Sequence, residues 1–194
     1  MRFIVVHKLI ASLLALLLVG CSFNVPDWSP EAVALRDLRA DPHLELVEIV
    51  ATRRWERGRV VLYRGIMQTG LHPGEGELVF GHIILQREGL GWRFIGGGSG
   101  SAGSAGPAGR RISYMYSSGS SIEHGSHSSV IGEVLTPEIE AVEIVFDDGR
   151  RLRDETEGDV FAFTVTGSVA PCALFLLDGE NQLVGHIGPR KCDE

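Results

Sequence analysis

Two segments rich in β-branched and aromatic residues decide the fold class: "IEAVEIVFDDGR" (Ile139–Arg150) and "DVFAFTVTG" (Asp159–Gly167). In the second segment, bulky apolar residues alternate with small or polar ones, so one face of an extended chain carries Phe161, Phe163 and Val165. In the first segment, Asp-Gly follows an apolar run and is a strong signal for a β-hairpin turn. Both segments therefore predict antiparallel strands, and the second predicts a strand with one buried side.

The same rhythm continues on both sides of these segments. Runs of strand character alternate with turn signals at intervals of about 8 to 12 residues, which is typical of an antiparallel β-sandwich or β-barrel. We expect an all-β domain over residues 44–194. Its further strands are expected at 44–51, 59–67, 77–87, 92–96, 129–135, 150–155, 172–178 and 182–187, with joints at 56–58, 88–91, 136–137, 157–158 and 178–181.

One short helix is expected before the strands. Ser29 has the side chain of an N-cap, Pro30 suits the first helical position, and Glu31 places an acid in the first turn. An apolar stripe follows, and Asp41-Pro42 ends the pattern. The sequence predicts about three helical turns that pack against the domain or hold it away from a membrane.

A Gly/Ser-rich stretch interrupts the strands between residues 96 and 129. It contains "GGGSGSAGSAGPAGRR" (Gly96–Arg111) and "YSSGSSIEHGSHSS" (Tyr116–Ser129). Residues without bulky side chains bury little apolar surface, so this stretch predicts a flexible loop or linker. We expect a long, mobile insertion in one β domain; the alternative is a linker between two β halves, each of which has few strands for a stable fold. The stretch has no G-K-[ST] sequence, which argues against a phosphate-binding loop.

The N-terminus has the plan of an export signal. Arg2 and Lys8 precede an uninterrupted apolar run from Leu9 to Val19. A positive front followed by a short apolar region is typical of a secretory signal peptide, here residues 1–20. A transmembrane anchor is the alternative, but the run is short for a span of roughly 20 residues.

The four residues Leu18-Val19-Gly20-Cys21 resemble the lipobox of bacterial lipoproteins. This resemblance implies cleavage before Cys21 and attachment of a diacylglycerol to its thiol, often with palmitate on the new amino group. Residues 21–43 would then be a lipidated tether and the short helix. The resemblance also implies a place on the cell membrane or outer membrane, facing the periplasm or the exterior.

The segment 131–187 resembles the immunoglobulin-like and transthyretin-like β modules of secreted bacterial proteins. Its pattern is "GEVL…VEIVFDDG…FAFTV…LFLLDGENQLVG". The resemblance implies a structural or binding module.

Charge indicates which class of partner is not expected, and cysteine content indicates which covalent bonds are possible. The 194 residues carry 18 Lys and Arg against 25 Asp and Glu, a formal net charge of −7. Nucleic acid is therefore not an expected partner. With Cys21 acylated, Cys172 and Cys192 remain, and export favours a disulfide between them. Two free thiols or a metal pair are the alternatives.

Charged clusters lie beside several predicted turns. "TRRWERGR" (Thr52–Arg59) and "RRLR" (Arg150–Arg153) are interpreted as solvated hairpin ends, with lipid headgroups or an acidic partner as the alternative. "DETEGD" (Asp154–Asp159) is interpreted as an acidic hairpin end, because it lacks the spacing of a calcium loop.

"IEHGSH" is the sharpest candidate for a metal site. Glu123, His124 and His127 lie within five residues, and a distant His82 or His186 would complete a zinc site. The segment is not H-E-x-x-H, and its Ser and Gly neighbours are equally typical of a solvated loop. No metal, cofactor or catalytic residue is assigned on this basis.

Several aromatic residues have two interpretations. Tyr63, Trp92, Tyr114 and Tyr116 would suit a carbohydrate or peptide surface, whereas Trp92 and Phe94 at strand spacing are more simply part of the core.

The resulting hypothesis is a non-catalytic binding or interaction module of the cell envelope, anchored to a membrane through Cys21. Its partner would be an envelope protein or a small ligand. The rival hypothesis is a metal-dependent enzyme, or a metal or small-ligand binder, that uses Glu123, His124 and His127. A third is a barrel that holds a small apolar ligand.

Overall fold

The computed structural model describes residues 29–68, 76–101, 111–121 and 125–188. The predicted signal peptide, Cys21, Glu123, His124 and Cys192 lie outside these ranges. The described residues form one helix, α2 (Pro30–Arg39), and eleven strands. The strands are β1 (Leu44–Trp55), β2 (Gly58–Gln68), β3 (Gly76–Glu88), β4 (Gly91–Ser101), β5 (Ile112–Ser121), β6 (Gly125–Val134), β7 (Ala141–Phe146), β8 (Arg151–Glu155), β9 (Val160–Thr166), β10 (Pro171–Leu177) and β11 (Leu183–Ile187).

Helix α2 confirms the predicted start and stop signals. The Ser29 side chain accepts a hydrogen bond of 3.0 Å from the Ala32 N–H, and Pro30 is the first helical residue. The helix ends at Arg39, just before Asp41-Pro42. It buries Val33, Ala34 and Leu38 against β1–β3.

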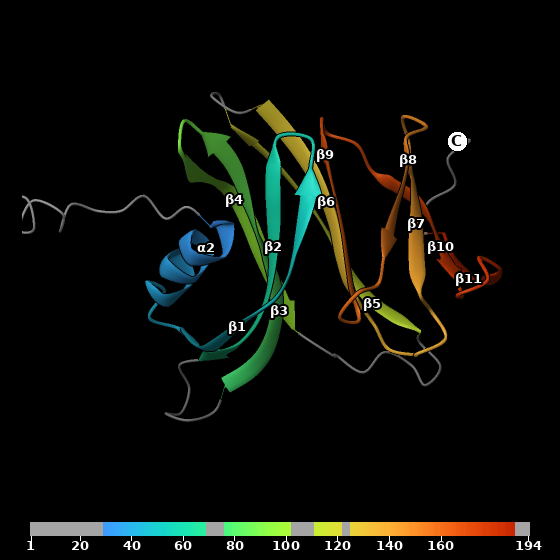
Figure 1. The fold of residues 1–194 in the computed structure, drawn as a ribbon, viewed down its shortest axis with the longest axis horizontal. Coiled ribbons are helices and arrows are strands. Elements are labelled where there is room, and N and C mark those ends of the chain that lie inside the picture. Colours follow the sequence, from blue (N-terminus) through green and yellow to red (C-terminus); the bar gives the residue numbers. More distant parts are fainter. Residues whose placement is uncertain (1–28, 69–75, 102–110, 122–124, 189–194) are drawn as a thin grey trace, which may run out of the picture.

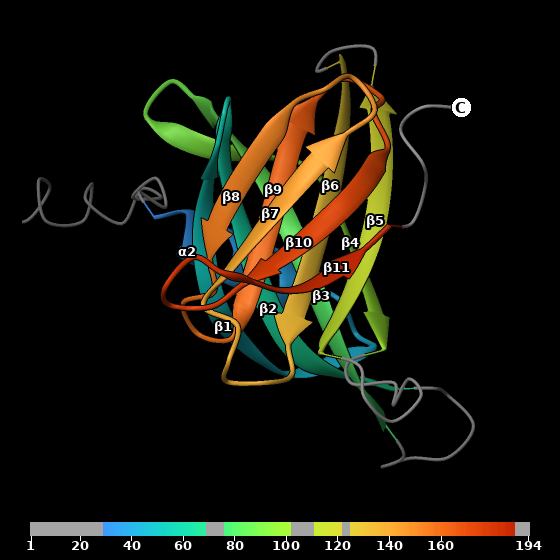
Figure 2. The same cartoon turned by 90° about the vertical axis from the view of Figure 1, so that its right-hand side faces the viewer.

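The strands form three antiparallel sheets, which confirms the predicted all-β, sandwich-like fold. Sheet A has the order β1-β2-β3-β4, sheet B has β5-β6-β9, and sheet C has β11-β10-β7-β8. Figure 1 shows α2 on the outer face of sheet A, with sheet B between sheets A and C. Figure 2 looks onto sheet C from its outer side.

Sheet B is buried on both faces. Toward sheet A it packs Ile131, Val160 and Ala162 against Leu62 and Ile84 of β2 and β3. Toward sheet C it packs a second set of side chains, among them Val130, Phe161, Phe163 and Val165, against Ile144, Phe146 and Leu174. The prediction that Asp159–Gly167 has only one buried side is therefore wrong, because the smaller Ala162 and Thr164 face the larger side chains of sheet A and are also buried.

The Gly/Ser-rich stretch is not one long loop. Residues 96–101 belong to β4, residues 112–121 form β5, and residues 125–129 begin β6. Glycine weakens a strand unless a neighbour uses the vacant space. The His127 ring does so, since a Cβ on Gly96 would lie 2.9 Å from His127 Nε2. The predicted flexible insertion over 96–129 is wrong for these three segments.

Four predicted hairpins are confirmed, and one predicted turn has another role. β1–β2, β3–β4, β7–β8 and β10–β11 pair as antiparallel neighbours. The turn at Glu157-Gly158, however, joins β8 of sheet C to β9 of sheet B. Gly158 and Asp159 both have positive φ there, 74° and 58°. The chain thus crosses between sheets where a hairpin end was expected.

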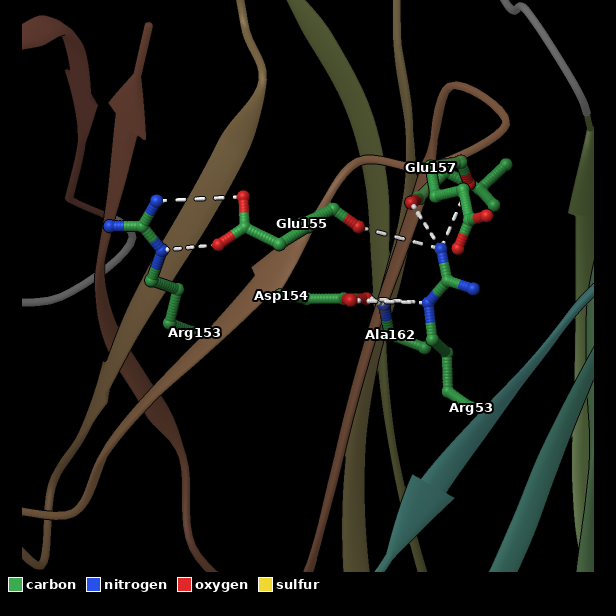
Figure 3. A network of polar contacts seen from close by, with 7 residues as sticks. Arg53, Arg153, Asp154, Glu155, Glu157 and Ala162 are labelled. Carbon is green, nitrogen blue, oxygen red and sulfur yellow. Dashed lines mark hydrogen bonds and ion pairs between the residues drawn. The ribbon is translucent and has the colours of Figure 1, made fainter. Parts of the chain in front are cut away.

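The charged clusters face one another across this crossing. Arg53 Nε on β1 donates to both carboxylate oxygens of Asp154 on β8, each at 3.1 Å, and Asp154 also accepts from the Ala162 N–H of β9 at 2.8 Å. Figure 3 shows this network, in which Arg53 also reaches the main-chain oxygen of Glu157. The interpretation of these charges as solvated hairpin ends is therefore wrong for Arg53 and Asp154, which join the three sheets.

Two further findings concern the predicted covalent and membrane features. Cys172 is buried on β10, and its predicted partner Cys192 lies outside the described residues, so that disulfide stays a prediction. In the part of the chain that the structure describes, no helix is long and apolar enough to cross a membrane.

Candidate functional site

A mostly apolar groove lies between α2 and β4. Its volume is about 460 Å³, within the range of small-ligand and side-chain pockets. It lies on the face of sheet A that α2 covers, at the edge that β4 forms. The lining residues are Asp37, Leu38, Ala40, Asp41, Leu44, Tyr63, Met67, His82, Ile83, Phe94, Gly97, Gly98 and Ser99.

The glycines of β4 create this groove. Gly97 and Gly98 pair with Ile83 and His82 of β3 but place no side chain over the sheet. Phe94 stands at the rim with 50% of its surface exposed, so the prediction that it belongs to the core is wrong. The side-chain-free strand therefore leaves the groove open between Phe94 and the end of α2.

A few polar groups converge on the apolar walls. Burial raises the pKa of the Tyr63 phenol, a hydrogen bond with the Ser99 side chain opposes this shift, and the Asp41 charge adds to it. The Tyr63 ring lies over Gly81, where a Cβ would be 2.6 Å from its Cζ. Two carboxylates line the groove: Asp37 on α2, which pairs with Arg36 at the surface, and Asp41 just after the helix. The groove thus offers apolar contact, hydroxyl groups and negative charge.

The opposite face of β4 holds a smaller, polar pocket. It has a volume of about 140 Å³ and lies between β4 and β5, the edge strands of sheets A and B. The His127 ring sits between two glycines, since a Cβ on Gly96 or on Gly119 would come within 2.9 Å of its ring atoms. The other lining residues are Ile95, Gly97, Ser117, Ser118 and Ser120.

His82 lies near this pocket, deeper between sheets A and B. It is 1% exposed, and its Nε2 is 3.4 Å from Ser117 Oγ. Its Nδ1 makes no hydrogen bond of good geometry with the described residues. Burial lowers the His82 pKa to about 4; a hydrogen bond with the Gly98 main chain opposes this shift, and the charge of His127 adds to it. Burial also lowers the pKa of His127. At neutral pH His82 is therefore an uncharged imidazole inside the sandwich.

The structure brings together only part of the predicted metal site. His127 on β6 and His82 on β3 are close enough for their charges to interact. His186 lies in sheet C, where its ring packs 5.0 Å from that of Phe175. Glu123 and His124 are outside the described residues. Among the residues that the structure describes, no three His, Cys, Asp or Glu side chains gather as metal ligands would.

Two other predicted or possible sites are less suited to a ligand. A larger hollow of about 730 Å³ lies between β5 and β11, but the Arg111 guanidinium donates across it to the Val184 carbonyl. Trp92 is partly buried against the core under α2, with the guanidinium of Arg87 5.2 Å from its ring. Arg111 and Trp92 therefore have structural roles.

Comparison with known proteins adds no identity. No known protein family, curated protein or solved structure matches this chain significantly. The candidate site therefore rests on its own geometry.

The sequence did not predict this site, because the composition of "GGGSG" (Gly96–Gly100) indicates a linker. The signal for a strand was that "GGGSG" directly continues the strand pattern of "WRFI" (Trp92–Ile95).

Proposed function

We propose that this chain is an exported lipoprotein whose β domain is a non-catalytic binding module of the cell envelope. Cys21 carries the lipid, and the groove between α2 and β4 is the binding surface. The module would lie on the cell membrane or outer membrane and face the periplasm or the exterior.

The observation that carries the binding role is the composition of the groove. Apolar side chains form most of its wall, while Tyr63, Ser99 and two carboxylates supply a small number of polar contacts. This combination is typical of a recognition site, in which apolar contact gives affinity and a few polar groups give orientation. Phe94 at the rim adds an exposed aromatic ring, a residue type enriched in binding surfaces.

Support for the anchor comes from the sequence. The lipobox-like Leu18-Val19-Gly20-Cys21 directly follows the apolar run of the signal. Two or three acyl chains hold a protein stably on a membrane, whereas one chain is marginal. Residues 21–28 separate the thiol from Ser29 and, fully extended, would span at most roughly 29 Å. The groove would therefore work close to the membrane surface. We also propose the disulfide Cys172–Cys192, which an exported location favours.

Site-specific photocrosslinking in native membranes tests this function. A benzophenone amino acid replaces Phe94 at the groove rim, and in a matched control it replaces Leu183 on β11, which is similarly exposed. We expect a discrete crosslinked partner or lipid only from position 94. Its loss in the Cys21→Ala variant, together with release of the chain from the membrane fraction, would support the anchor. Equal crosslinking from both positions would contradict a binding role for the groove.

The rival hypothesis, a metal-dependent activity or metal binding, keeps one favourable observation. His82 lies near His127, as a site assembled from the two strands would require. The double variant His124→Ala/His127→Ala separates the hypotheses. It should leave crosslinking at position 94 unchanged if the groove is the site, and abolish function if the histidines are. Added zinc that raises the Tm of the wild type but not of this variant would support the rival.

A further inference from the structure

β4 is an edge strand, and in the described structure its edge is less protected than those of β5, β8, β9 and β11. In the described part of the chain the edges are β1 and β4 of sheet A, β5 and β9 of sheet B, and β11 and β8 of sheet C. An exposed edge carries unpaired main-chain N–H and C=O groups that attract another strand. Proteins normally block such edges with charges, prolines, irregularities or covering side chains.

Side chains cover the edge of β9, which faces β1 and β8. Asp154 accepts from the Ala162 N–H, at 2.8 Å, and Arg53 donates to the Val160 carbonyl. At the far end of the strand, Arg150 donates to the Thr166 carbonyl at 2.7 Å. β8 itself is short and carries charged side chains at most of its positions. Neither of these strands presents an open edge.

The edges of β5 and β11 are linked to each other. Arg111, immediately before β5, donates to the Val184 carbonyl of β11. Tyr116 on β5 donates from its hydroxyl to the Val169 carbonyl at 2.9 Å. β11 is only five residues long. These contacts and this length limit pairing with another chain.

Among the residues that the structure describes, none gives β4 comparable protection over most of its length. From Phe94 to Ser101 it contains no charged residue and no proline, and among the described strands it pairs only with β3. The one irregularity in its pairing lies between Ile84 and Leu85 of β3, before the glycines. Residues 96–101 therefore form a smooth edge with almost no side chains.

The two pockets lie on opposite faces of this edge. The apolar groove of about 460 Å³ and the polar pocket of about 140 Å³ both include Gly97 in their walls. Successive side chains of a β-strand point to opposite faces of its sheet. A strand added beside β4 would therefore place alternate side chains in the apolar groove and in the polar pocket.

We infer that β4 binds an extended peptide segment of a partner protein as an additional strand of sheet A. The segment alternates large apolar residues, which enter the α2–β4 groove, with small hydroxyl residues, which face His127 and the serines of β5. A basic residue lies beside the apolar ones, since Asp37 and Asp41 line the groove. In such complexes the main-chain hydrogen bonds give affinity and the alternate side chains give specificity. This inference rests on the proposed binding function and names its partner class.

Synthetic peptides test the inference on the full-length chain purified in detergent. The probe is an acetylated heptapeptide that alternates Leu and Ser and has Lys at both ends. Its binding is measured by isothermal titration calorimetry. A peptide of the same composition with its Leu and Ser residues in separate blocks is the control. Two further peptides keep the alternating order but carry N-methyl groups, one on the Leu residues and the other on the Ser residues. Since only one edge of the added strand faces β4, we expect one of these two to lose binding.

We expect the alternating peptide to bind at least tenfold more tightly than the block peptide. Phe94→Lys should weaken its binding at least tenfold, and Leu183→Lys on β11 should not, with Tm measured for both variants. Ser99→Lys provides a second variant if Phe94→Lys does not fold. No binding of the alternating peptide at about 1 mM, the weak limit of specific recognition, would overturn the inference. Equal binding of both N-methylated peptides would also overturn it.

The two proposals fail differently. A crosslinked partner from position 94 in membranes, without peptide binding, would leave the groove as a binding surface and refute strand addition. Binding of the alternating peptide, without any membrane partner lost in Cys21→Ala, would support strand addition and remove the proposed role of the anchor.

Discussion

Arg53 and Asp154 are 101 residues apart in sequence, yet Arg53 Nε lies 3.1 Å from both carboxylate oxygens. The pair links sheet A to sheet C at the point where the chain crosses from sheet C to sheet B (Figure 3). Burial raises the pKa of Asp154, while the Ala162 N–H and the Arg53 charge oppose that shift. The carboxylate on β8 of sheet C thus has two partners from the other sheets: the Arg53 cation of sheet A and the Ala162 N–H at the edge of β9 in sheet B.

Removing the Asp154 carboxylate should destabilise the fold. In Asp154→Ala the Arg53 guanidinium, whose side chain is 16% exposed, loses its partner, and the Ala162 N–H loses its acceptor. Breaking a buried pair by removing one partner costs about 3 kcal/mol. We expect a loss of that size in the free energy of unfolding in urea.

Arg151→Ala on the same strand is the matched control for that experiment. The Arg151 side chain is 63% exposed and pairs with Glu143 at the surface. Exposed pairs contribute about 0 to 1 kcal/mol. Equal losses in the two variants would contradict a special role for the Arg53–Asp154 contact.

Acid should destabilise the protein through His82. Its pKa is about 4 in the fold and is near 6.5 in an unfolded chain. As pH falls below 6.5, the unfolded state binds a proton that the folded state does not, so stability decreases until pH reaches about 4. This difference corresponds to a loss of up to about 3 kcal/mol. Urea unfolding at pH 7 and pH 4.5 measures most of it.

A variant without an ionisable side chain at position 82 separates the effect of this histidine on acid stability from the effect of the carboxyl groups, which also titrate. His82→Gln should show a smaller loss of stability between pH 7 and pH 4.5 than the wild type. His186→Gln, at an exposed position of β11, should keep the full loss. If His82→Gln and the wild type lose the same free energy, the burial of an uncharged His82 does not control acid stability.

Local signals in the sequence are sufficient to predict most of the elements of the fold. Ser29-Pro30 and Asp41-Pro42 bound α2 as predicted, because caps and prolines act within one or two turns. Asp148-Gly149 lies in the β7–β8 hairpin, because Gly149 takes a φ of 82° that few other residues adopt. Such features depend on neighbouring residues alone.

The site depended on contacts that no local pattern carries. Whether Gly96–Gly100 is a linker or a strand is decided by what fills the vacant side-chain positions, here His127 from β6 and Met115 from β5. Likewise, the sequence alone predicts that Arg53 and Asp154 are solvated charges. They form an ion pair because the chain crosses between sheets at Gly158. The composition of a segment shows which of its positions have no side chain, and only the tertiary structure shows which other residues fill that space.

The fit between Gly96 and His127 gives a further prediction. A Cβ on Gly96 would lie 2.9 Å from His127 Nε2, so Gly96→Ala must displace the ring. Overpacking of this kind costs about 1 to 3 kcal/mol. In the His127→Ala background the space is empty, and the same substitution should cost much less. A double-mutant cycle by urea unfolding measures this coupling.

Gly98→Ala is the control for that cycle, because among the described residues its Cβ would meet only His82 Cε1, at an ordinary 3.6 Å. We expect it to show little coupling to His127→Ala. Coupling of similar size at both glycines would mean that the strand responds to any added methyl group, and that the His127 ring does not specifically occupy the space beside Gly96.

The proposed Cys172–Cys192 disulfide should contribute measurably to stability. Cys172 is 1% exposed on β10, and Cys192 belongs to the C-terminal tail that follows β11. Closing a loop of this size stabilises a fold by about 3 kcal/mol in the chain-entropy account. A Cys172→Ala/Cys192→Ala variant should lose about that amount, whereas the wild type under reducing conditions should approach the variant. Thiol titration of the denatured, unreduced Cys21→Ala chain should find no free sulfhydryl, and two free thiols would refute the bridge.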